Sequence, residues 1–117
     1  MHPPAPGSNR PLHIDFNLYT DGDEVYKKEL IALFIGNLKE LQFAQQQSAE
    51  QQDQKIFLIA GHKIKTTLSI LNDDELTAWV GKLSQPISDD SIWPPKEGPR
   101  LNEICAEIIH SLEKECQ

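Results

Sequence analysis

The segment KIFLIAGHKIKTTLSIL, residues 55–71, decides which fold the sequence predicts. Apolar residues recur in it at intervals of three and four, which is the spacing of one face of an α-helix. At about 3.6 residues per turn, one stripe of side chains lies within about 60° of Phe57 and predicts the side that faces the core. This stripe consists of Phe57, Ala60, Ile64, Leu68 and Leu71. We therefore expect one amphipathic helix over residues 55–71.

The other side of this predicted helix carries a histidine. His62 lies about 140° from Phe57, Thr66 follows one turn later, and Lys65 lies on the flank at about 80°. Residues 55–71 contain no carboxylate. An uncharged, partly apolar collar around an exposed polar group is typical of a docking surface. The collar that we predict around His62 consists of Leu58, Ile59, Gly61, Thr66, Ser69 and Ile70.

Two features support a functional reading of this surface. A glycine in the middle of a helix costs about 1 kcal/mol relative to alanine, and Gly61 is explained if another surface must approach His62 closely. A neutral histidine is a nucleophile, and a neighbouring lysine ammonium attracts a phosphoryl group. Simpler readings stay open, because a single exposed histidine most often has no function and the collar also fits a helix packed on several sides. Lys63 and Lys65 can also be ordinary surface lysines that only increase solubility.

Three further helices are predicted. The first runs from about Asp23 to Gln46 with an Asp21–Glu24 capping pair, and the polar residues 47–54 are a connection or the start of the next helix, with Ser48 or Asp53 as its cap. Its apolar positions are Val25, Leu30, Leu33, Phe34, Leu38, Leu41 and Phe43. Another helix starts at Asn72 and ends before Pro86, and the last covers 100–117. The apolar stripe of the last helix is Leu101, Ile104, Cys105, Ile108, Ile109 and Leu112.

These elements predict an all-α protein, an up-down four-helix bundle. We assign residues 15–117 to a single helical domain and residues 1–14, which are rich in proline, to a disordered tail. The chain of 117 residues is long enough for one domain with a modest core. The proline-rich segment 86–99, with Trp93, is predicted as a loop that packs Trp93 on the bundle.

The charge, the apolar residues and the cysteines of the chain argue against several classes of function. A formal charge of −7 argues against nucleic acid as a partner, and no apolar run approaches the roughly 20 residues that span a membrane. Cys105 and Cys116 lie eleven positions apart on one predicted helix, about 16 Å, which is too far for a disulfide. Two free thiols favour a reducing compartment, so we expect a cytoplasmic protein, and a monomer.

Several kinds of site are not indicated by the sequence. The four histidines, His2, His13, His62 and His110, are scattered and form no metal-ligand pair on one helix. We find no P-loop or other glycine-rich phosphate cradle and no serine or cysteine nucleophile motif. We therefore expect no metal, no bound cofactor and no ATP-dependent kinase activity, so a phosphoryl group on this chain would have to come from another protein.

The segment AGHKIKTT, residues 60–67, resembles the signature of histidine-containing phosphotransfer (HPt) domains. That signature reads Ala, His, any residue, Leu or Ile, Lys, Gly or Ala, then Ser or Ala, and His62, Ile64, Lys65 and Thr67 match it in type and spacing. Residues 21–41 look like the first bundle helix of the family, and residues 71–83 look like the helix that follows the histidine helix. The resemblance covers residues 20–85, about two-thirds of the chain.

The resemblance implies a four-helix bundle whose exposed histidine carries a phosphoryl group in a two-component phosphorelay. His62 would accept that group from a phospho-aspartate on a response-regulator receiver domain, downstream of a sensor (hybrid) histidine kinase, and pass it to another receiver. Lys65 would be the electrostatic partner of the phosphoryl oxygens, and Mg²⁺ would be supplied by the receiver. The expected partner-binding residues are Leu58, Ile59, Gly61, Lys63, Thr66 and Ser69.

The chain departs from the family pattern at two positions. Thr66 stands where the family has Gly or Ala, and its hydroxyl can hydrogen-bond a phosphoryl oxygen while its methyl group can obstruct a partner. Asn72 replaces a common glycine, and asparagine tolerates the same left-handed backbone. Two alternatives therefore stay open: an HPt-like binding module that docks on a kinase or response regulator without carrying phosphate, and an unrelated helical adaptor in which His62 is a bystander.

Overall fold

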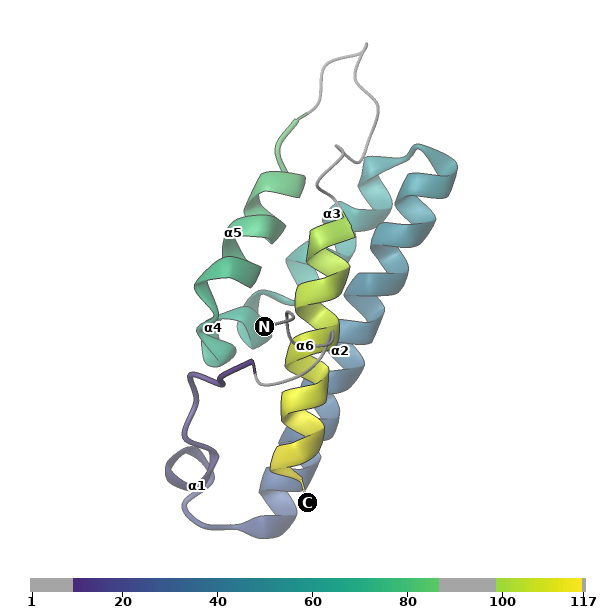
Figure 1. The fold of residues 1–117 in the computed structure, drawn as a ribbon. Coiled ribbons are helices and arrows are strands. Elements are labelled where there is room, and N and C mark those ends of the chain that lie inside the picture. Colours follow the sequence, from purple (N-terminus) through teal and green to yellow (C-terminus); the bar gives the residue numbers. More distant parts are fainter. Residues whose placement is uncertain (1–9, 87–98, 117) are drawn as a thin grey trace, which may run out of the picture.

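The computed structural model describes residues 10–86 and 99–116, and this part of the chain is all-helical with no strand. Figure 1 shows its elements in chain order. They are α1 (Phe16–Tyr19), α2 (Glu24–Gln51), α3 (Gln54–Lys63), α4 (Lys65–Leu71), α5 (Asp74–Leu83) and α6 (Pro99–Glu115). The predicted all-α class is confirmed. Trp93 and most of the predicted loop 86–99 lie outside the described residues.

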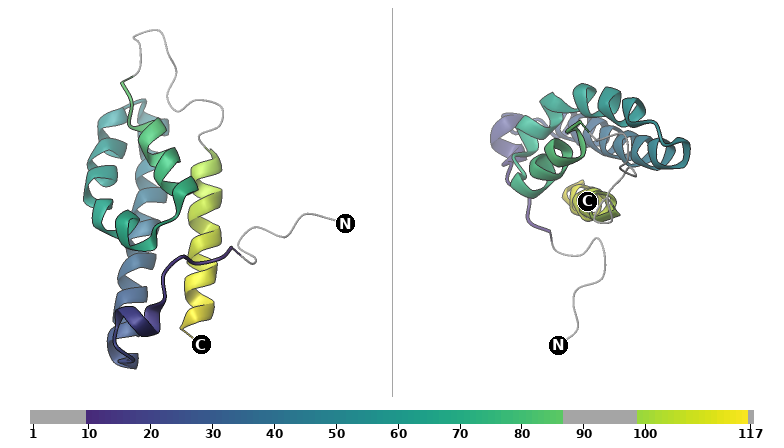
Figure 2. Two further views of the ribbon diagram at one scale, coloured as in Figure 1. Left: turned by 90° about the vertical axis from the view of Figure 1, so that its left-hand side faces the viewer. Right: turned by 90° about the horizontal axis from the view of Figure 1, so that it is seen from above.

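The longest helix, α2, organises the others around it. It packs against α3 on one side and against α6 on another, and α5 packs against α6. Figure 2 shows α3 and α5 beside each other, joined by α4 about halfway along α2. None of the described helices is both long enough and apolar enough to cross a membrane.

The core lies between α2, α3, α4, α5 and α6, and the predicted stripes of two helices point into it. All five residues of the stripe that starts at Phe57 are buried, and so are all six of the predicted stripe on α6. Three apolar positions predicted for the first helix are instead exposed: Val25 (68 %), Leu33 (57 %) and Phe43 (62 %). Val25 and Phe43 lie five full turns apart on one face, opposite the buried Phe34.

Side-chain caps set the helix starts, and two of them differ from the prediction. Asp23, not Asp21, caps α2 by accepting from the Tyr26 N–H at 3.0 Å, while Asp21 has a left-handed backbone with φ 54°. Asp53 caps α3, as one of the two alternatives predicted.

The turn before α5 is also capped one residue later than predicted. Asp73 caps α5 by accepting from the Leu76 N–H at 3.0 Å. Asn72 ends α4 in the left-handed conformation, with φ 52°, that we expected a glycine substitute to adopt.

The segment 55–71 is not one uninterrupted helix. α3 ends at Lys63 and α4 begins at Lys65, with Ile64 between them at φ −87° and ψ 0°. The Ile64 N–H still donates to the Ala60 oxygen, and its own oxygen accepts from the Leu68 N–H. A ψ near zero departs from the helical value of about −42°, so the axis changes at this residue. Ile64 is only 2 % exposed, and the break leaves it in the core.

The N-terminal segment is ordered earlier than predicted. Residues 10–14, which we assigned to the tail, include the partly buried Arg10, Leu12 and Ile14 and pack against the helices. A short helix, α1, follows with Phe16 buried in the core. The boundary between tail and domain therefore lies before residue 14, because distant side chains hold this segment.

Candidate functional site

His62 lies in the last turn of α3 with its side chain exposed. The side chains of Phe57, Ala60 and Ile64 on the same stretch are buried, so His62 points away from the core. Among the described residues, none makes a hydrogen bond or ion pair with the His62 ring. The imidazole is therefore open to solvent and to any partner that approaches this face.

The exposed face around His62 holds most of the residues that the sequence predicted there. Leu58 is 37 % exposed and Ile59 is 64 % exposed, so an apolar surface borders the histidine. Lys65, Thr66 and Ser69 are exposed on α4. Both sides of the break at Ile64 thus contribute to one outward-facing surface.

Gly61 does not belong to this exposed surface. It is buried against α5, and a Cβ atom at this position would lie 3.6 Å from both Val80 Cγ1 and Ser84 Oγ. Ser84 uses its hydroxyl within α5, donating to the Val80 oxygen at 2.7 Å. The expectation that Gly61 gives a partner access to His62 is therefore wrong, because Gly61 faces α5 and not the exposed surface.

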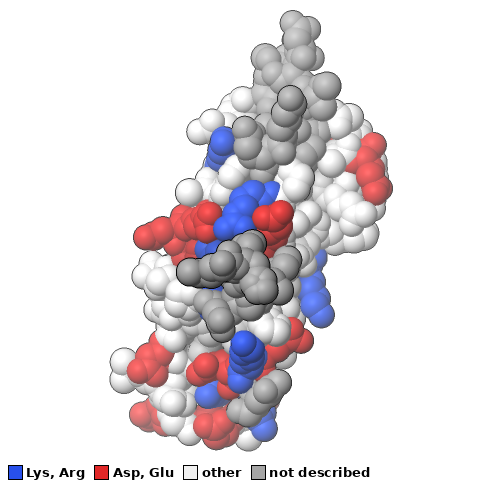
Figure 3. All heavy atoms as spheres, viewed as in Figure 1, with Lys and Arg blue, Asp and Glu red and all other residues white. Residues whose placement is uncertain are grey.

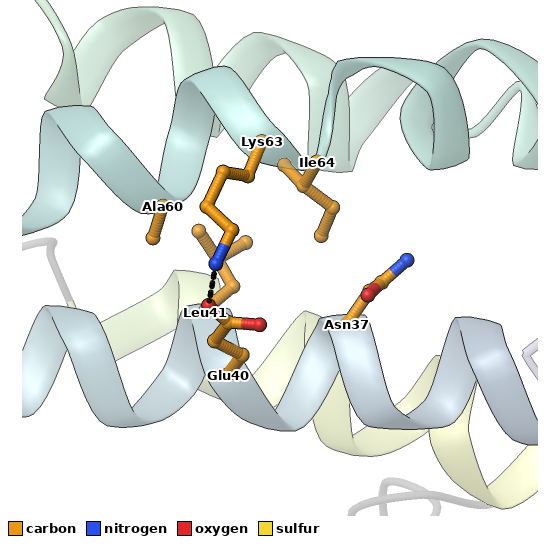
Figure 4. Close-up of a pocket in the computed structure, with 6 residues that line it drawn as sticks. All are labelled: Asn37, Glu40, Leu41, Ala60, Lys63 and Ile64. Carbon is orange, nitrogen blue, oxygen red and sulfur yellow. Dashed lines mark hydrogen bonds and ion pairs between the residues drawn. The ribbon is translucent and has the colours of Figure 1, made fainter.

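Lys63 is exposed but already has a partner from another helix. Its Nζ lies 2.7 Å from Oε1 of Glu40 on α2, and the two side chains are 62 % and 50 % exposed. Figure 4 shows this pair across a small hollow between α2 and α3. The hollow has a volume of about 60 Å³ and is lined by Asn37, Glu40, Leu41, Ala60, Lys63 and Ile64.

The Glu40 carboxylate changes the electrostatics expected from the sequence. Residues 55–71 lack carboxylates, but α2 brings one to the same side of the molecule. No local sequence signal pairs Glu40 with Lys63, since 23 positions separate them. Lys65, in contrast, makes no ion pair within the described residues, so its ammonium remains available beside His62.

Thr67, which matches the resemblance in type, has a structural contact. It is buried, and its Oγ1 accepts a hydrogen bond from Asn37 Nδ2 at 2.8 Å. This bond joins α4 to α2 immediately after the break at Ile64. It therefore helps to fix the position of α4, which carries Lys65 and Thr66.

Other kinds of site find little support in the described part of the chain. No group of three or more His, Cys, Asp or Glu side chains there could hold a metal ion. Cys105 and Cys116 are both free, as predicted. Burial raises the pKa of the Cys105 thiol to about 12, so this thiol is not a nucleophile near neutral pH.

His62, with Lys65 and the apolar border beside it, is therefore the best candidate site that these residues form. The comparisons with known proteins add no relative: no family model, no curated protein and no solved structure matches the chain.

Proposed function

We propose that this chain is a histidine phosphotransfer protein that carries a phosphoryl group on His62 between receiver-domain aspartates of a two-component phosphorelay. The observation that carries the proposal is the exposed imidazole of His62 on an ordered helix, which has no hydrogen-bond or ion-pair partner among the described residues, with the exposed Lys65 three residues later. The resemblance of residues 60–67 to the HPt signature suggests that the reaction at this surface is phosphoryl transfer.

The proposed architecture is an up-down four-helix bundle in a single domain. Three of its four helical segments would be α2, α5 and α6, and α3 together with α4 would be the fourth. The packing of α2 against α3 and α6, and of α5 against α6, supports this arrangement. Such a bundle holds the histidine helix rigidly while leaving its outer face free for a partner.

The proposed transfer needs few groups from this chain. The lone pair of a neutral imidazole nitrogen forms a P–N bond as the P–O bond to the donor aspartate breaks, and the aspartate leaves as a carboxylate. Charge on the three phosphoryl oxygens is spread through a loose transition state, so alignment and nearby cations dominate catalysis. Lys65 would supply one cation here, and the receiver domain would supply Mg²⁺ and its own aspartate.

Electrostatic and apolar features both suit a receiver domain as the partner. A receiver presents an acidic cleft, which Lys65 complements, while Lys63 is shared with Glu40. Leu58, Ile59 and Ser69 would provide a small contact area around the reacting pair, consistent with a transient complex. A sensor histidine kinase would act upstream, because the phosphoryl group must enter the relay elsewhere.

The test is phosphotransfer from radiolabelled receiver domains of the same genome, each loaded with acetyl phosphate, to the wild type and to His62→Gln. We expect an acid-labile, base-stable label on the wild type and none on His62→Gln. His110→Gln is the matched control, because His110 is an exposed histidine on α6. A label that persists in His62→Gln, or that depends on His110, would contradict the proposal.

A second candidate function is favoured by one residue. The exposed Thr66 follows His62 by one turn, where its methyl group can hold a receiver aspartate away from the imidazole. The chain would then be a binding module that docks on a kinase or receiver without carrying phosphate. Receiver binding to an unlabelled wild type, together with transfer gained on Thr66→Ala, would favour this function over the first.

A further inference from the structure

The N-terminal segment of the described chain forms a contact that the proposed function does not explain. Residues 10–14, which we call the strap, form no helix and run past the start of α5 and across α6 (Figures 1 and 2). The strap starts at Arg10, whose side chain is only 11 % exposed. Figure 3 shows basic side chains flanked by acidic ones in the middle of this face of the molecule.

The guanidinium of Arg10 binds three carboxylates from two helices. Nη2 and Nε donate to the two oxygens of Asp73 at 2.8 and 2.9 Å, a paired, fork-like geometry. Nη2 also donates to Glu75 at 3.0 Å, and Nη1 donates to Glu107 of α6 at 3.4 Å. The Asp73 side chain is only 7 % exposed, so this is a built site for a planar cation rather than a surface encounter.

The rest of the strap is held loosely. Ser111 of α6 donates to the Arg10 backbone oxygen at 2.6 Å, and Leu12 and Ile14 pack, partly buried, against the core. Within the described residues, no hydrogen bond joins the backbone of residues 11–14 to a helix. A small gap remains beneath this part of the strap, lined by Pro11, Leu12, His13, Leu71, Asp73 and Ile108.

Asp73 links the strap to the start of α5. The same carboxylate oxygen that accepts from Arg10 Nη2 also accepts from the Leu76 N–H, as the cap of that helix. The contact with Arg10 therefore orients the capping side chain. It also ties the turn between α4 and α5 to α6 through Glu107.

We propose that Asp73, Glu75 and Glu107 form an arginine-binding site whose ligand is the chain's own Arg10, and that this site works as the latch of a strap that opens without unfolding the helices. The ligand class is an alkylguanidinium, because a lysine ammonium cannot make the paired bonds to Asp73. With Arg10 released, the strap contacts that remain among the described residues are mainly those of the partly buried Leu12 and Ile14, so local opening is far easier than global unfolding. The proposal is independent of phosphotransfer at His62.

The test is limited proteolysis of the full chain with thermolysin, which cuts before large apolar residues and therefore before Leu12 or Ile14 once the strap opens. We expect Arg10→Ala to raise the rate of cleavage in the strap about tenfold or more, while the helices stay intact. Mass spectrometry identifies the cut sites, and circular dichroism checks that helicity is kept. Arg10→Lys retains the charge without the fork and should give an intermediate rate.

Two controls separate a guanidinium latch from a general charge effect. Arg100→Ala removes a cation that also contacts Glu75 and Glu107 but belongs to α6, and it should leave strap cleavage close to the wild-type rate. Methylguanidinium at about 10 mM should slow the cleavage of Arg10→Ala, by binding the empty site, and methylammonium should not.

Three results would overturn the proposal. The first is an unchanged rate of strap cleavage in Arg10→Ala. The second is cleavage of the helices at the same rate as the strap, which would make Arg10 a general structural anchor. The third is equal rescue of Arg10→Ala by the two added cations.

Discussion

Two charged surfaces of this molecule use their side chains in opposite ways. On the face of α3 and α4, His62 and Lys65 have no hydrogen-bond or ion-pair partner among the described residues. On the edge formed by the strap, α5 and α6, Arg10 and Arg100 bind carboxylates from both helices. The second surface uses its charges to hold the fold together, whereas the first leaves His62 and Lys65 available to another molecule.

Burial explains why the ion pairs of the two surfaces contribute differently to the stability of the fold. The Arg10 side chain is 11 % exposed and meets Asp73 through two bonds, whereas the Lys63 side chain is 62 % exposed and meets Glu40 through one. Exposed ion pairs contribute about 0–1 kcal/mol, because water competes and two long side chains lose freedom. Substitutions on the His62 face should therefore affect stability little, and substitutions at the strap should affect it more.

The largest expected effect tests which side of α3 faces the core. Phe57→Ala removes a ring that is fully buried and should lower the free energy of unfolding by about 3–5 kcal/mol. His62→Gln, five residues later on the exposed side, should change it by no more than about 0.5 kcal/mol. Urea unfolding followed by circular dichroism measures both. A similar loss in the two variants would show that His62 is part of the packed interior.

The next effect concerns the strap and depends on pH. Burial alone raises the pKa of the Asp73 carboxyl, but hydrogen bonds from Arg10 and the Leu76 N–H outweigh it and hold that pKa below its ordinary value. A carboxylate with a lowered folded-state pKa stabilises the fold above its unfolded-state pKa of about 3.9. That contribution is lost as pH falls through the folded-state value.

Arg10→Ala should therefore cost about 1–3 kcal/mol of unfolding free energy at pH 7, because it leaves a buried carboxylate with one fewer partner. The difference from the wild type should shrink as pH drops below about 4 and Asp73 takes up a proton. Urea titrations of both proteins between pH 7 and pH 3 measure this. A difference that stays constant over that range would assign the effect of Arg10 to packing alone.

Sequence reasoning was most successful where one face of a helix is buried. The stripe from Phe57 to Leu71 was predicted in full, because helical spacing and burial coincide there. The same reasoning was wrong for Val25 and Phe43, which are exposed on α2. A helix as long as α2 has neighbours on only part of its surface, and spacing alone does not say which apolar residues those neighbours cover.

The contacts that the sequence did not reveal all join distant parts of the chain. Arg10 reaches carboxylates 63 to 97 positions away, so the proline-rich start of the chain looked like a free tail. Glu40 reaches Lys63 from another helix, and Gly61 is buried against α5. The exposure of His62 was predicted from its angle on the helix, whereas these neighbours depend on how the helices pack.

A smaller effect, of opposite sign, tests the structural role of Gly61. The space around it accommodates a Cβ atom at ordinary contact distance from Val80 and Ser84, so Gly61→Ala should not clash. Alanine is the better helix former, and the variant should gain about 0.5–1 kcal/mol of unfolding free energy. Thermal unfolding measures the gain. A loss of stability would mean that α5 lies closer to residue 61 than these distances indicate, so that the added methyl group clashes with it.

The smallest effect on stability belongs to Lys65, and it sharpens the contrast between the two surfaces. Lys65→Ala should leave the unfolding free energy within about 0.5 kcal/mol of the wild type, since the side chain is exposed and forms no ion pair in the described residues. If Lys65 contacts the phosphoryl group, transfer should slow by about 10- to 100-fold, the effect of losing one charge-assisted hydrogen bond.

Lys63→Ala is the matched control for Lys65→Ala, because it removes another exposed lysine, whose charge is already shared with Glu40. Lys63→Ala should slow transfer less than Lys65→Ala does. Transfer rates measured with the same phosphorylated receiver show which lysine contributes more to the reaction. Equal slowing would point to general attraction by the surface rather than to a specific contact at Lys65. A collapse of stability in Lys65→Ala would instead place this residue with Arg10, among the charges that the fold itself requires.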